Sequence, residues 1–360
     1  MARSRGKLRS IGIVLLASAL LLLIAALAGG SYQAIAWRAD AQRFPRPGRL
    51  VSAGEFRLNV YCTGQGSPTV ILESGLADTL DQWRRVQPAI ARFARVCSYD
   101  RAGYGYSDPG PMPRTSDRIA SELHSALGMA GEKPPYLLVG SSFGGFIVRV
   151  FSGKYPDQVA GLLLVDATQE DQYRLLPRSW SNLGAATRRR AQRQAFWAPL
   201  YIDLGIARLQ LRMQGQEVSH VLLESKYLKA RTSEFENIQV SAEQARTADH
   251  IAEKPLVVLT AGKPIDASLK AALSEEDQNA YAETWVNDLQ LRLAHLSKRG
   301  TREVVVDSGH DMPTDRPDAI VTAVRELCAP KKAAITRRSS RKFSMSVGSI
   351  TSLPFPCAPE

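Results

Sequence analysis

A serine between glycines at residues 140–144 gives the chain its clearest chemical signal, the pattern Gly-x-Ser-x-Gly. The apolar run Tyr136–Val139 precedes it directly, and the helix-like run Phe146–Phe151 follows it. In this context the glycines allow a sharp strand-to-helix turn that exposes the hydroxyl, and free N–H groups at the helix start lie beside it. The pattern predicts that Ser142 is a nucleophile; a purely structural glycine-rich turn is the alternative.

His310 offers the base that such a serine needs, since a hydroxyl at its ordinary pKa is a weak nucleophile. It follows the last β-like run of the chain, and Gly309 gives the loop freedom to turn the imidazole back over the sheet. The other histidines fall in helical or linker stretches and are expected at the surface: His124, His220, His250 and His295. The chain therefore predicts a Ser142–His310 pair.

Eight apolar β-like runs could position this pair: Arg49–Ala53, Phe56–Cys62, Thr69–Glu73, Arg95–Tyr99, Tyr136–Gly140, Gly161–Asp166, Leu256–Ala261 and Arg302–Val306. Several are continuous apolar runs, which is typical of strands covered on both faces. Helix-spaced apolar residues lie between them, for example from Trp83 to Phe93. The alternation predicts an α/β domain over residues 49–328, with an eight-stranded, mostly parallel sheet and helices on both faces.

The interval between Asp166 and Pro255 breaks this alternation, because it shows helical composition and no β-like run. We expect an inserted helical cap at about residues 167–254, and an ordinary helical excursion at the sheet edge is the alternative. The basic run Arg188–Arg190 is expected to be a solvated helix face.

Taken together, these motifs resemble the α/β-hydrolase family, and within it the prolyl-aminopeptidase-like and esterase-like branch. The resemblance covers about residues 49–328. Besides Ser142 and His310, it includes Tyr99–Asp108, which is similar to the glycine-rich loop after the family's fourth strand. It implies a small-molecule substrate and neither a metal nor an organic cofactor.

The oxyanion hole follows from the same resemblance. Glu73–Leu76 stands at the position of the family's oxyanion loop, where Ser74 replaces the usual histidine. Because such a hole is built from backbone N–H groups, those of Phe143 and Leu76 are expected to hold the oxyanion.

Two residues are candidates for the acid that orients the histidine. The family usually supplies it after the seventh strand, where Asp266 stands slightly off the usual spacing. Some relatives place it at the end of the sixth strand, where Asp166 stands. We favour Asp166, keep Asp266 as the alternative, and note that either could instead cap a helix or loop, as Asp100 could.

The resemblance also bears on two of the four cysteines. Because strands two and four are neighbours in this fold, Cys62 and Cys97 could form a disulfide in an oxidising compartment, and two buried thiols are the alternative. No Cys-x-x-Cys pair or His/Cys cluster with metal spacing occurs, so we expect no metal site.

The activity that the resemblance implies is that of a serine hydrolase similar to carboxylic-ester hydrolases. It would cleave an ester or amide of a small or lipid-like substrate through an acyl-enzyme on Ser142. One alternative is a proline-type aminopeptidase, which would need an acidic cap residue such as Glu170 or Asp171. Another is a non-catalytic receptor for a small ligand on the same fold.

The N-terminus predicts a membrane segment. Residues 1–10 are basic and residues 11–36 carry no charge; the run Ile11–Ala28 would span about 27 Å as a helix. We expect a transmembrane anchor with a cytoplasmic N-terminus and an extracytoplasmic catalytic domain. The alternative is a signal peptide cleaved near Ala26–Ala28, which would release a secreted or periplasmic protein.

The net charge of +11 lies mostly at the two ends of the chain. Residues 1–9 carry +4 and residues 329–360 carry +5, which leaves +2 for everything between. The basic character therefore does not predict a nucleic-acid partner. Residues 330–360 are rich in Ser, Lys, Arg and Pro and are expected to be a disordered tail. The oligomeric state stays open.

Overall fold

The computed structural model describes residues 2–214, 220–248 and 251–329. His250 lies outside these ranges, and so does the predicted tail at residues 330–360. The side chain of His220 is also not described. His295 is exposed, as expected. His124 differs, because it is half-buried and stacks on Tyr155 with the ring centroids 3.8 Å apart.

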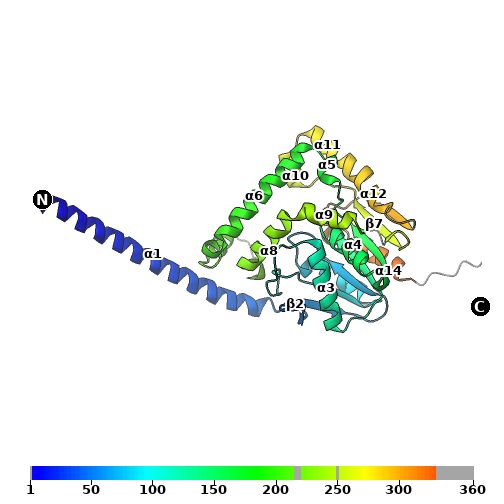
Figure 1. The fold of residues 1–360 in the computed structure, drawn as a ribbon, viewed down its shortest axis with the longest axis horizontal. Helices are drawn as coiled ribbons and strands as arrows, with labels where there is room; N and C mark the ends of the chain where they lie inside the picture. Colours follow the sequence, from blue (N-terminus) through cyan, green and yellow to red (C-terminus); the bar gives the residue numbers. More distant parts are fainter. Residues whose placement is uncertain (1, 215–219, 249–250, 330–360) are drawn as a thin grey trace, which may run out of the picture. The chain divides into compact units, whose positions relative to one another are not determined.

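Eight strands form one sheet in the order β1-β2-β4-β3-β5-β6-β7-β8. They are β1 (Arg49–Ser52), β2 (Arg57–Thr63), β3 (Thr69–Glu73), β4 (Val96–Tyr99), β5 (Tyr136–Ser141), β6 (Val159–Val165), β7 (Leu256–Ala261) and β8 (Gly300–Val305). The β1–β2 and β2–β4 pairs are antiparallel, and the other five pairs are parallel. The predicted eight-stranded, mostly parallel sheet is confirmed (Figure 1).

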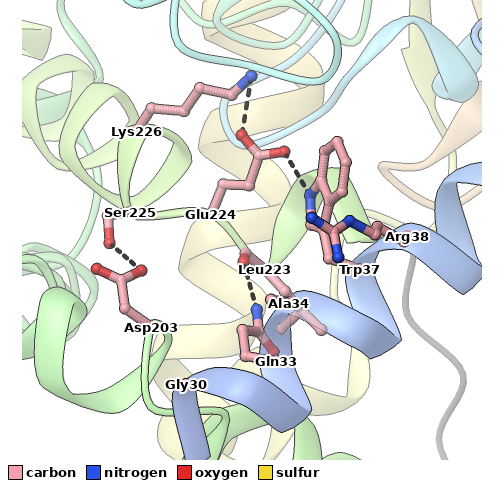
Figure 2. A pocket seen from close by; sticks show the side chains of 10 residues that line it. All are labelled: Gly30, Gln33, Ala34, Trp37, Arg38, Asp203, Leu223, Glu224, Ser225 and Lys226. Carbon is pink, nitrogen blue, oxygen red and sulfur yellow. Dashed lines mark hydrogen bonds and ion pairs between the residues drawn. The ribbon is translucent and has the colours of Figure 1, made fainter. Parts of the chain in front are cut away.

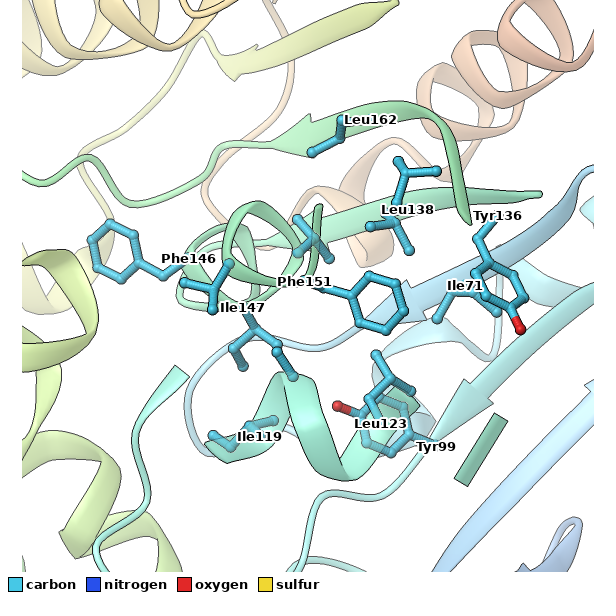
Figure 3. Packing of buried hydrophobic residues seen from close by; sticks show 14 of the residues in the cluster. Ile71, Tyr99, Ile119, Leu123, Tyr136, Leu138, Phe146, Ile147, Phe151 and Leu162 are labelled. Atoms are coloured by element: carbon cyan, nitrogen blue, oxygen red, sulfur yellow. The ribbon is translucent and has the colours of Figure 1, made fainter. Parts of the chain in front are cut away.

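Helices cover both faces of the sheet because the central strands are apolar on both sides. β3 and β5 are buried at every position. On one face, Ile71 and Leu138 pack against α3 (Ser116–Ala130) and α4 (Gly144–Lys154), as Figure 3 shows. On the other face, alternate residues of the same strands pack against α2 (Gln87–Ile90) and α14 (Pro317–Cys328). Continuous apolar runs are thus explained by two covered faces.

The predicted helix between Trp83 and Phe93 is interrupted in the structure. Leu80–Trp83 forms a 3-10 helix, and α2 begins again at Gln87. Pro88 stands in the first turn of α2; it has no N–H to continue the preceding helix, and its fixed φ suits a new helix start. Trp83 is nonetheless completely buried, so the periodicity identified the buried face although the helix itself is broken.

The interval between β6 and β7 contains helices and, in its described residues, no strand. These helices are α5 (Gln172–Leu175), α6 (Arg178–Tyr201), α7 (Ile206–Met213), a short 3-10 helix (His220–Leu222), α8 (Ser225–Glu236) and α9 (Ile238–Arg246). α6 and α8 pack against each other (Figure 1). From α8, the Tyr227 hydroxyl donates to the Ala77 carbonyl in the loop after β3, at 2.8 Å. The helical interval therefore contacts loops at the carboxyl edge of the sheet.

One short 3-10 helix (Pro156–Gln158) precedes β6, and the remaining described helices flank β7 and β8 or form the N-terminus. They are α10 (Ala267–Ala272), α11 (Glu275–Glu283), a π-helix (Thr284–Leu289), α12 (Gln290–Ala294), α13 (Met312–Asp315) and α1 (Ala2–Arg43). Within α1, Ser10–Arg43 is long and apolar enough to cross a membrane, with a mean hydropathy of 2.9 in its most apolar window and none of that window buried. Length and composition support a membrane-spanning helix here, although a signal sequence would meet the same criteria.

Candidate active site

Ser142 lies on a sharp turn between β5 and α4. Its φ of 49° is in the left-handed region, which is uncommon for a residue with a side chain. The turn needs glycine on both sides: a Cβ on Gly140 would lie 2.7 Å from the Gly144 carbonyl oxygen, and one on Gly144 would lie 2.6 Å from the Glu73 carbonyl oxygen. This strained strand-to-helix turn is the geometry that the Gly-x-Ser-x-Gly pattern predicts.

His310 comes from the loop after β8 and reaches the serine. Its Nε2 lies 2.9 Å from Ser142 Oγ, within hydrogen-bond distance. The loop is held by the Gly309 N–H, which donates to an Asp315 carboxylate oxygen at 2.8 Å. The His310 side chain is 43% exposed, so solvent and a ligand can reach the ring.

Asp166 completes a hydrogen-bonded row of three side chains. It follows β6, is completely buried, and its Oδ2 lies 2.6 Å from His310 Nδ1. Its other oxygen, Oδ1, accepts from Trp285 Nε1 and from the Ala261 N–H, both at 2.9 Å. Two donors therefore fix the carboxylate plane, so that the remaining oxygen points at the imidazole.

Asp266, the alternative acid, has a different position. Its Oδ1 accepts from the N–H groups of Ser268 and Leu269, both at 2.8 Å, which makes it the N-cap of α10. Partial burial raises the pKa of Asp266, but the hydrogen bond from the Ser268 hydroxyl and those from the two N–H groups together lower it by more. The structure therefore brings Asp166 and not Asp266 into contact with His310.

The electrostatics of the site favour a proton on the imidazole. Removal from water lowers the pKa of His310, but the hydrogen bond and negative charge of Asp166 raise it by more. The net result is a pKa above the ordinary value of 6.5. An imidazole with this support is suited to take a proton from Ser142 and hold it beside the carboxylate.

The backbone at the proposed oxyanion positions lies next to the serine. A Cβ on Gly75 would be 3.5 Å from Ser142 Cβ, so the loop after β3 passes directly over the serine. Within the described part of the chain, the N–H groups of Leu76 and Phe143 have no hydrogen-bond partner. Ser74, at the position where the resemblance implies a histidine, holds the loop: its Oγ donates to the Thr79 carbonyl and accepts from Trp83 Nε1, both at 3.0 Å.

The family follows from a match over just over half of the chain. The family model described as alpha/beta hydrolase fold matches residues 68–251. The chain belongs to this family.

Individual relatives are similar to this chain over limited stretches. The α/β-hydrolase chain is 27% identical to the uncharacterized protein YbdG of Bacillus subtilis over 163 residues, which cover 45% of this chain and 50% of that protein. It is 35% identical over 113 residues to an AB hydrolase superfamily protein of Gibberella zeae, covering 30% of this chain and 35% of that protein. The chain thus spans half or less of the length of these relatives.

A solved structure extends the likeness of the fold to most of the chain. The enol-lactonase from Burkholderia xenovorans LB400 superposes with a TM-score of 0.53 at 16% identity, covering 78% of this chain and 99% of that one. At this identity the likeness concerns the architecture alone.

A buried arginine, which the sequence did not single out, organises the loops of this α/β-hydrolase site. Arg101 is 2% exposed and forms ion pairs with Glu73 at 2.8 Å and Glu234 at 2.9 Å. It also donates to the carbonyls of Ser74 and Gly75, at 2.8 and 2.7 Å. One guanidinium thus joins the loop after β3 to α8 of the helical interval. Burial raises the pKa of Glu73 to about 7, and the charge of Arg101 opposes that rise.

Asp78 is a second carboxylate near the imidazole that the sequence did not point out. Its Oδ2 accepts from Gln82 Nε2 at 3.0 Å, and Gln82 Oε1 accepts from the Gly75 N–H at 3.0 Å. Burial raises the pKa of Asp78 to about 6, while the charge of Arg101 lowers it. Its charge also contributes to the raised pKa of His310. No sequence motif distinguishes this aspartate from the others in the loop.

The other acidic residues considered at the sequence level have structural partners. Asp100 is buried and accepts from the N–H groups of Leu80 and Tyr106 and from the Asn59 amide, which makes it a loop cap. Glu170 forms an ion pair with the buried Arg149 at 2.6 Å. Asp171 has three arginine partners: Arg174, Arg246 and Arg292. The residues of the Arg188–Arg190 run are exposed or half-buried on α6.

Cys62 and Cys97 are joined by a disulfide in the structure. They stand directly opposite each other on β2 and β4, with the Cα atoms 4.0 Å apart. Together with Glu132 they are the one group in the described residues whose donor atoms could hold a metal ion, and the bonded sulfurs offer no thiolate to it.

Proposed function

We propose that this α/β-hydrolase-fold chain is a serine hydrolase that works through an acyl-enzyme. The observation that supports it is the row of contacts from Ser142 Oγ to His310 Nε2 and from His310 Nδ1 to Asp166 Oδ2, at 2.9 and 2.6 Å. A serine needs such a base to become a good nucleophile, and the base needs a group that orients it.

The proposed reaction has two halves. In the first, His310 Nε2 takes the Ser142 proton while Oγ attacks the substrate carbonyl, and the N–H groups of Phe143 and Leu76 donate to the oxyanion. The protonated imidazole then gives its proton to the leaving group as the carbon–heteroatom bond breaks. In the second half, water loses a proton to His310 and attacks the acyl carbonyl; the imidazolium then gives this proton to Ser142 Oγ as the acyl–oxygen bond breaks, which releases the acid and restores the serine. Asp166 stabilises the imidazolium in both halves.

An ester or amide of a small or lipid-like molecule is the substrate class we propose, with the ester favoured. An aminopeptidase needs a free carboxylate for the substrate's α-amine, and Glu170 and Asp171 are both paired with arginines. The prolyl-aminopeptidase-like branch stays a prediction. A structural neighbour is named an enol-lactonase, and a lactone is an ester, which is consistent with an ester as the proposed substrate.

We further propose that α1 anchors the chain in a membrane with the catalytic domain on the extracytoplasmic side. The apolar stretch of α1 supports the anchor. The four basic residues before Ser10 support a cytoplasmic N-terminus, because positive charge flanking a span is retained on that side. Cleavage near Ala28 and release of the domain is the competing fate.

The test is hydrolysis of a p-nitrophenyl ester chain-length series by the full chain, beside Ser142→Ala and the matched control Ser141→Ala. Ser141 is the neighbouring serine at the end of β5, but His310 Nε2 contacts Ser142 Oγ, so loss of the Ser141 hydroxyl should leave turnover intact. A fluorophosphonate should label the wild type at Ser142 only, by peptide mass. Full turnover in Ser142→Ala would refute the mechanism, and an inert wild type that still binds ligand would favour the receptor alternative.

A further inference from the structure

Besides the apolar side that faces the core, the helices α6 and α7 carry an apolar surface on the outside of the protein. Met213 is 80% exposed, Phe196 74% and Trp197 57%. The α6–α7 surface comprises six large side chains that are each more than 40% exposed: Phe196, Trp197, Leu200, Ile206, Leu209 and Met213. Single exposed apolar residues are ordinary, but six on two consecutive helices mark an interaction site.

The opposite side of the same two helices is already packed. Ala198, Ile202 and Ala207 are buried in a cluster with Leu223 of the helical interval. A helix on the surface of a soluble domain needs one apolar stripe, which faces the core. Because the core-facing stripe is used, none of the described elements is left to cover the α6–α7 surface.

The linker between α6 and α7 touches α1 at the point where its apolar run ends. A Cβ on Gly29 would lie 2.4 Å from the Leu204 carbonyl oxygen, and one on Gly205 would lie 3.0 Å from the Tyr32 ring. Gly29 comes directly after Ile11–Ala28, which as a helix spans about 27 Å, close to the hydrocarbon thickness of a bilayer. The tip of the α6–α7 segment therefore lies at the level where the membrane core would end.

Polar contacts hold this junction. Arg208 of α7 is buried; its Nε donates to Gln33 Oε1 at 2.8 Å, and it forms an ion pair with Asp40. Trp37 Nε1 donates to Glu224 Oε1 at 3.2 Å, as Figure 2 shows. The end of α1 is thus specifically joined to α7 and to the start of α8.

Arginines adjoin the α6–α7 surface. Arg189, Arg190 and Arg193 line a groove on α6 together with Trp197 and Tyr201. Tryptophan and tyrosine favour the headgroup region of a bilayer, and clustered arginines attract anionic lipids. Apolar side chains beside such arginines match a helix that lies in the membrane surface.

We propose that the α6–α7 surface docks on the same bilayer that α1 crosses, with its arginines on anionic headgroups. This rests on the anchoring by α1 proposed above, and it is independent of the chemistry at Ser142. The bilayer is the occupant because α1 brings lipid to this surface at a fixed depth. A second copy of the chain would first have to displace that lipid.

The test is spin labelling of the full chain in nanodiscs that hold one copy each, in a Cys328→Ser/Cys357→Ser background. Labels are placed at Met213 and Leu209 on the surface, at Leu16 inside the apolar run, and at Val240. Val240 is the matched control, an apolar α9 residue that is 48% exposed and outside the surface. Collision with oxygen and with a nickel chelate measures the depth of each label, with and without anionic phosphatidylglycerol.

Docking predicts that the labels at Leu16, Met213 and Leu209 are less accessible to nickel and more accessible to oxygen than the label at Val240. The Val240 label should remain in water. Arg189→Gln/Arg190→Gln/Arg193→Gln should reduce the shift at Met213 that phosphatidylglycerol adds. A membrane-buried Leu16 with an aqueous Met213 would overturn docking alone, whereas an aqueous Leu16 would overturn the anchor and this proposal together. Protection of Met213 only in nanodiscs with two copies would identify an interface between copies and overturn the bilayer as occupant.

Discussion

Replacing Asp166 with Asn should abolish most of the turnover while leaving the fold intact. Asp166 Oδ1 accepts two hydrogen bonds from buried donors, the Trp285 indole and the Ala261 N–H. In Asp166→Asn the amide oxygen keeps both bonds only if it takes the Oδ1 position. The amide nitrogen then faces His310 Nδ1, which must accept a hydrogen bond in place of donating one.

This reversal places the imidazole proton on Nε2, and a protonated Nε2 cannot accept the proton of Ser142. The productive tautomer needs the flipped amide, which leaves two buried donors unsatisfied at a cost of about 1–3 kcal/mol each. A total of about 2–6 kcal/mol corresponds to a loss of kcat of about 30-fold to about 3 × 10⁴-fold, since each 1.36 kcal/mol is tenfold. Substrate binding should change little, because Asp166 is buried behind His310.

The assay is kcat and KM on the best p-nitrophenyl ester, with thermal unfolding of each variant. Asp266→Asn is the matched control, because Asn caps a helix as well as Asp does and α10 should keep its first turn. Its turnover and Tm should stay close to wild type. Near-normal turnover in a folded Asp166→Asn would refute the tautomer argument, and a large loss in Asp266→Asn would make Asp266 the acid.

Two further perturbations test the electrostatics around the row. Because the pKa of His310 is raised and the neutral ring is the base, kcat/KM should rise with pH through a midpoint above 6.5. Asp78→Asn removes a negative charge that raises the pKa of His310, so the midpoint of its pH profile should be lower than that of the wild type. An unchanged midpoint in Asp78→Asn would contradict the assignment. Arg101→Met leaves two buried carboxylates without their cation and should cost about 3–5 kcal/mol of unfolding free energy in denaturant titration. Glu234→Gln keeps the shape of the site and leaves the Glu73 pair, so it should cost less. Losses near zero in both variants would mean that the ion pairs matter little.

The proposed nucleophile and base could be picked out from the sequence because local patterns point to them. The Gly-x-Ser-x-Gly pattern that marks the turn lies within five residues, and His310 follows the last strand. The acid could not be settled in the same way, since Asp166 and Asp266 each follow a strand at the same edge of the sheet. What separates them is tertiary: Trp285, 119 residues further along the chain, donates to Asp166.

Buried charge was the other feature beyond the reach of the sequence. Arg101 lies in a polar loop motif, and such a residue is normally solvated. Only folding brings Glu73 and Glu234 to it from positions 28 and 133 residues away. The helix expected from Trp83 to Phe93 failed for a local reason, because Pro88 restarts the helix, so the apolar period indicated burial more reliably than secondary structure.

The described contacts between α1 and the catalytic domain include Gly29, Gln33 and Asp40, which gives truncations two distinct outcomes. A chain that begins at residue 29 keeps Gln33 and Asp40 on Arg208, whereas a chain that begins at residue 44 leaves that buried guanidinium without its carboxylate. Because loss of one partner of a buried pair costs about 3–5 kcal/mol, the shorter chain should expose α7 to amide hydrogen exchange while the longer one protects it. Equal protection of α7 in both would show that α1 adds nothing to the domain beyond its apolar run. A difference would mean that residues 29–43 belong structurally to the catalytic domain, whether Ile11–Ala28 stays in the membrane or is removed.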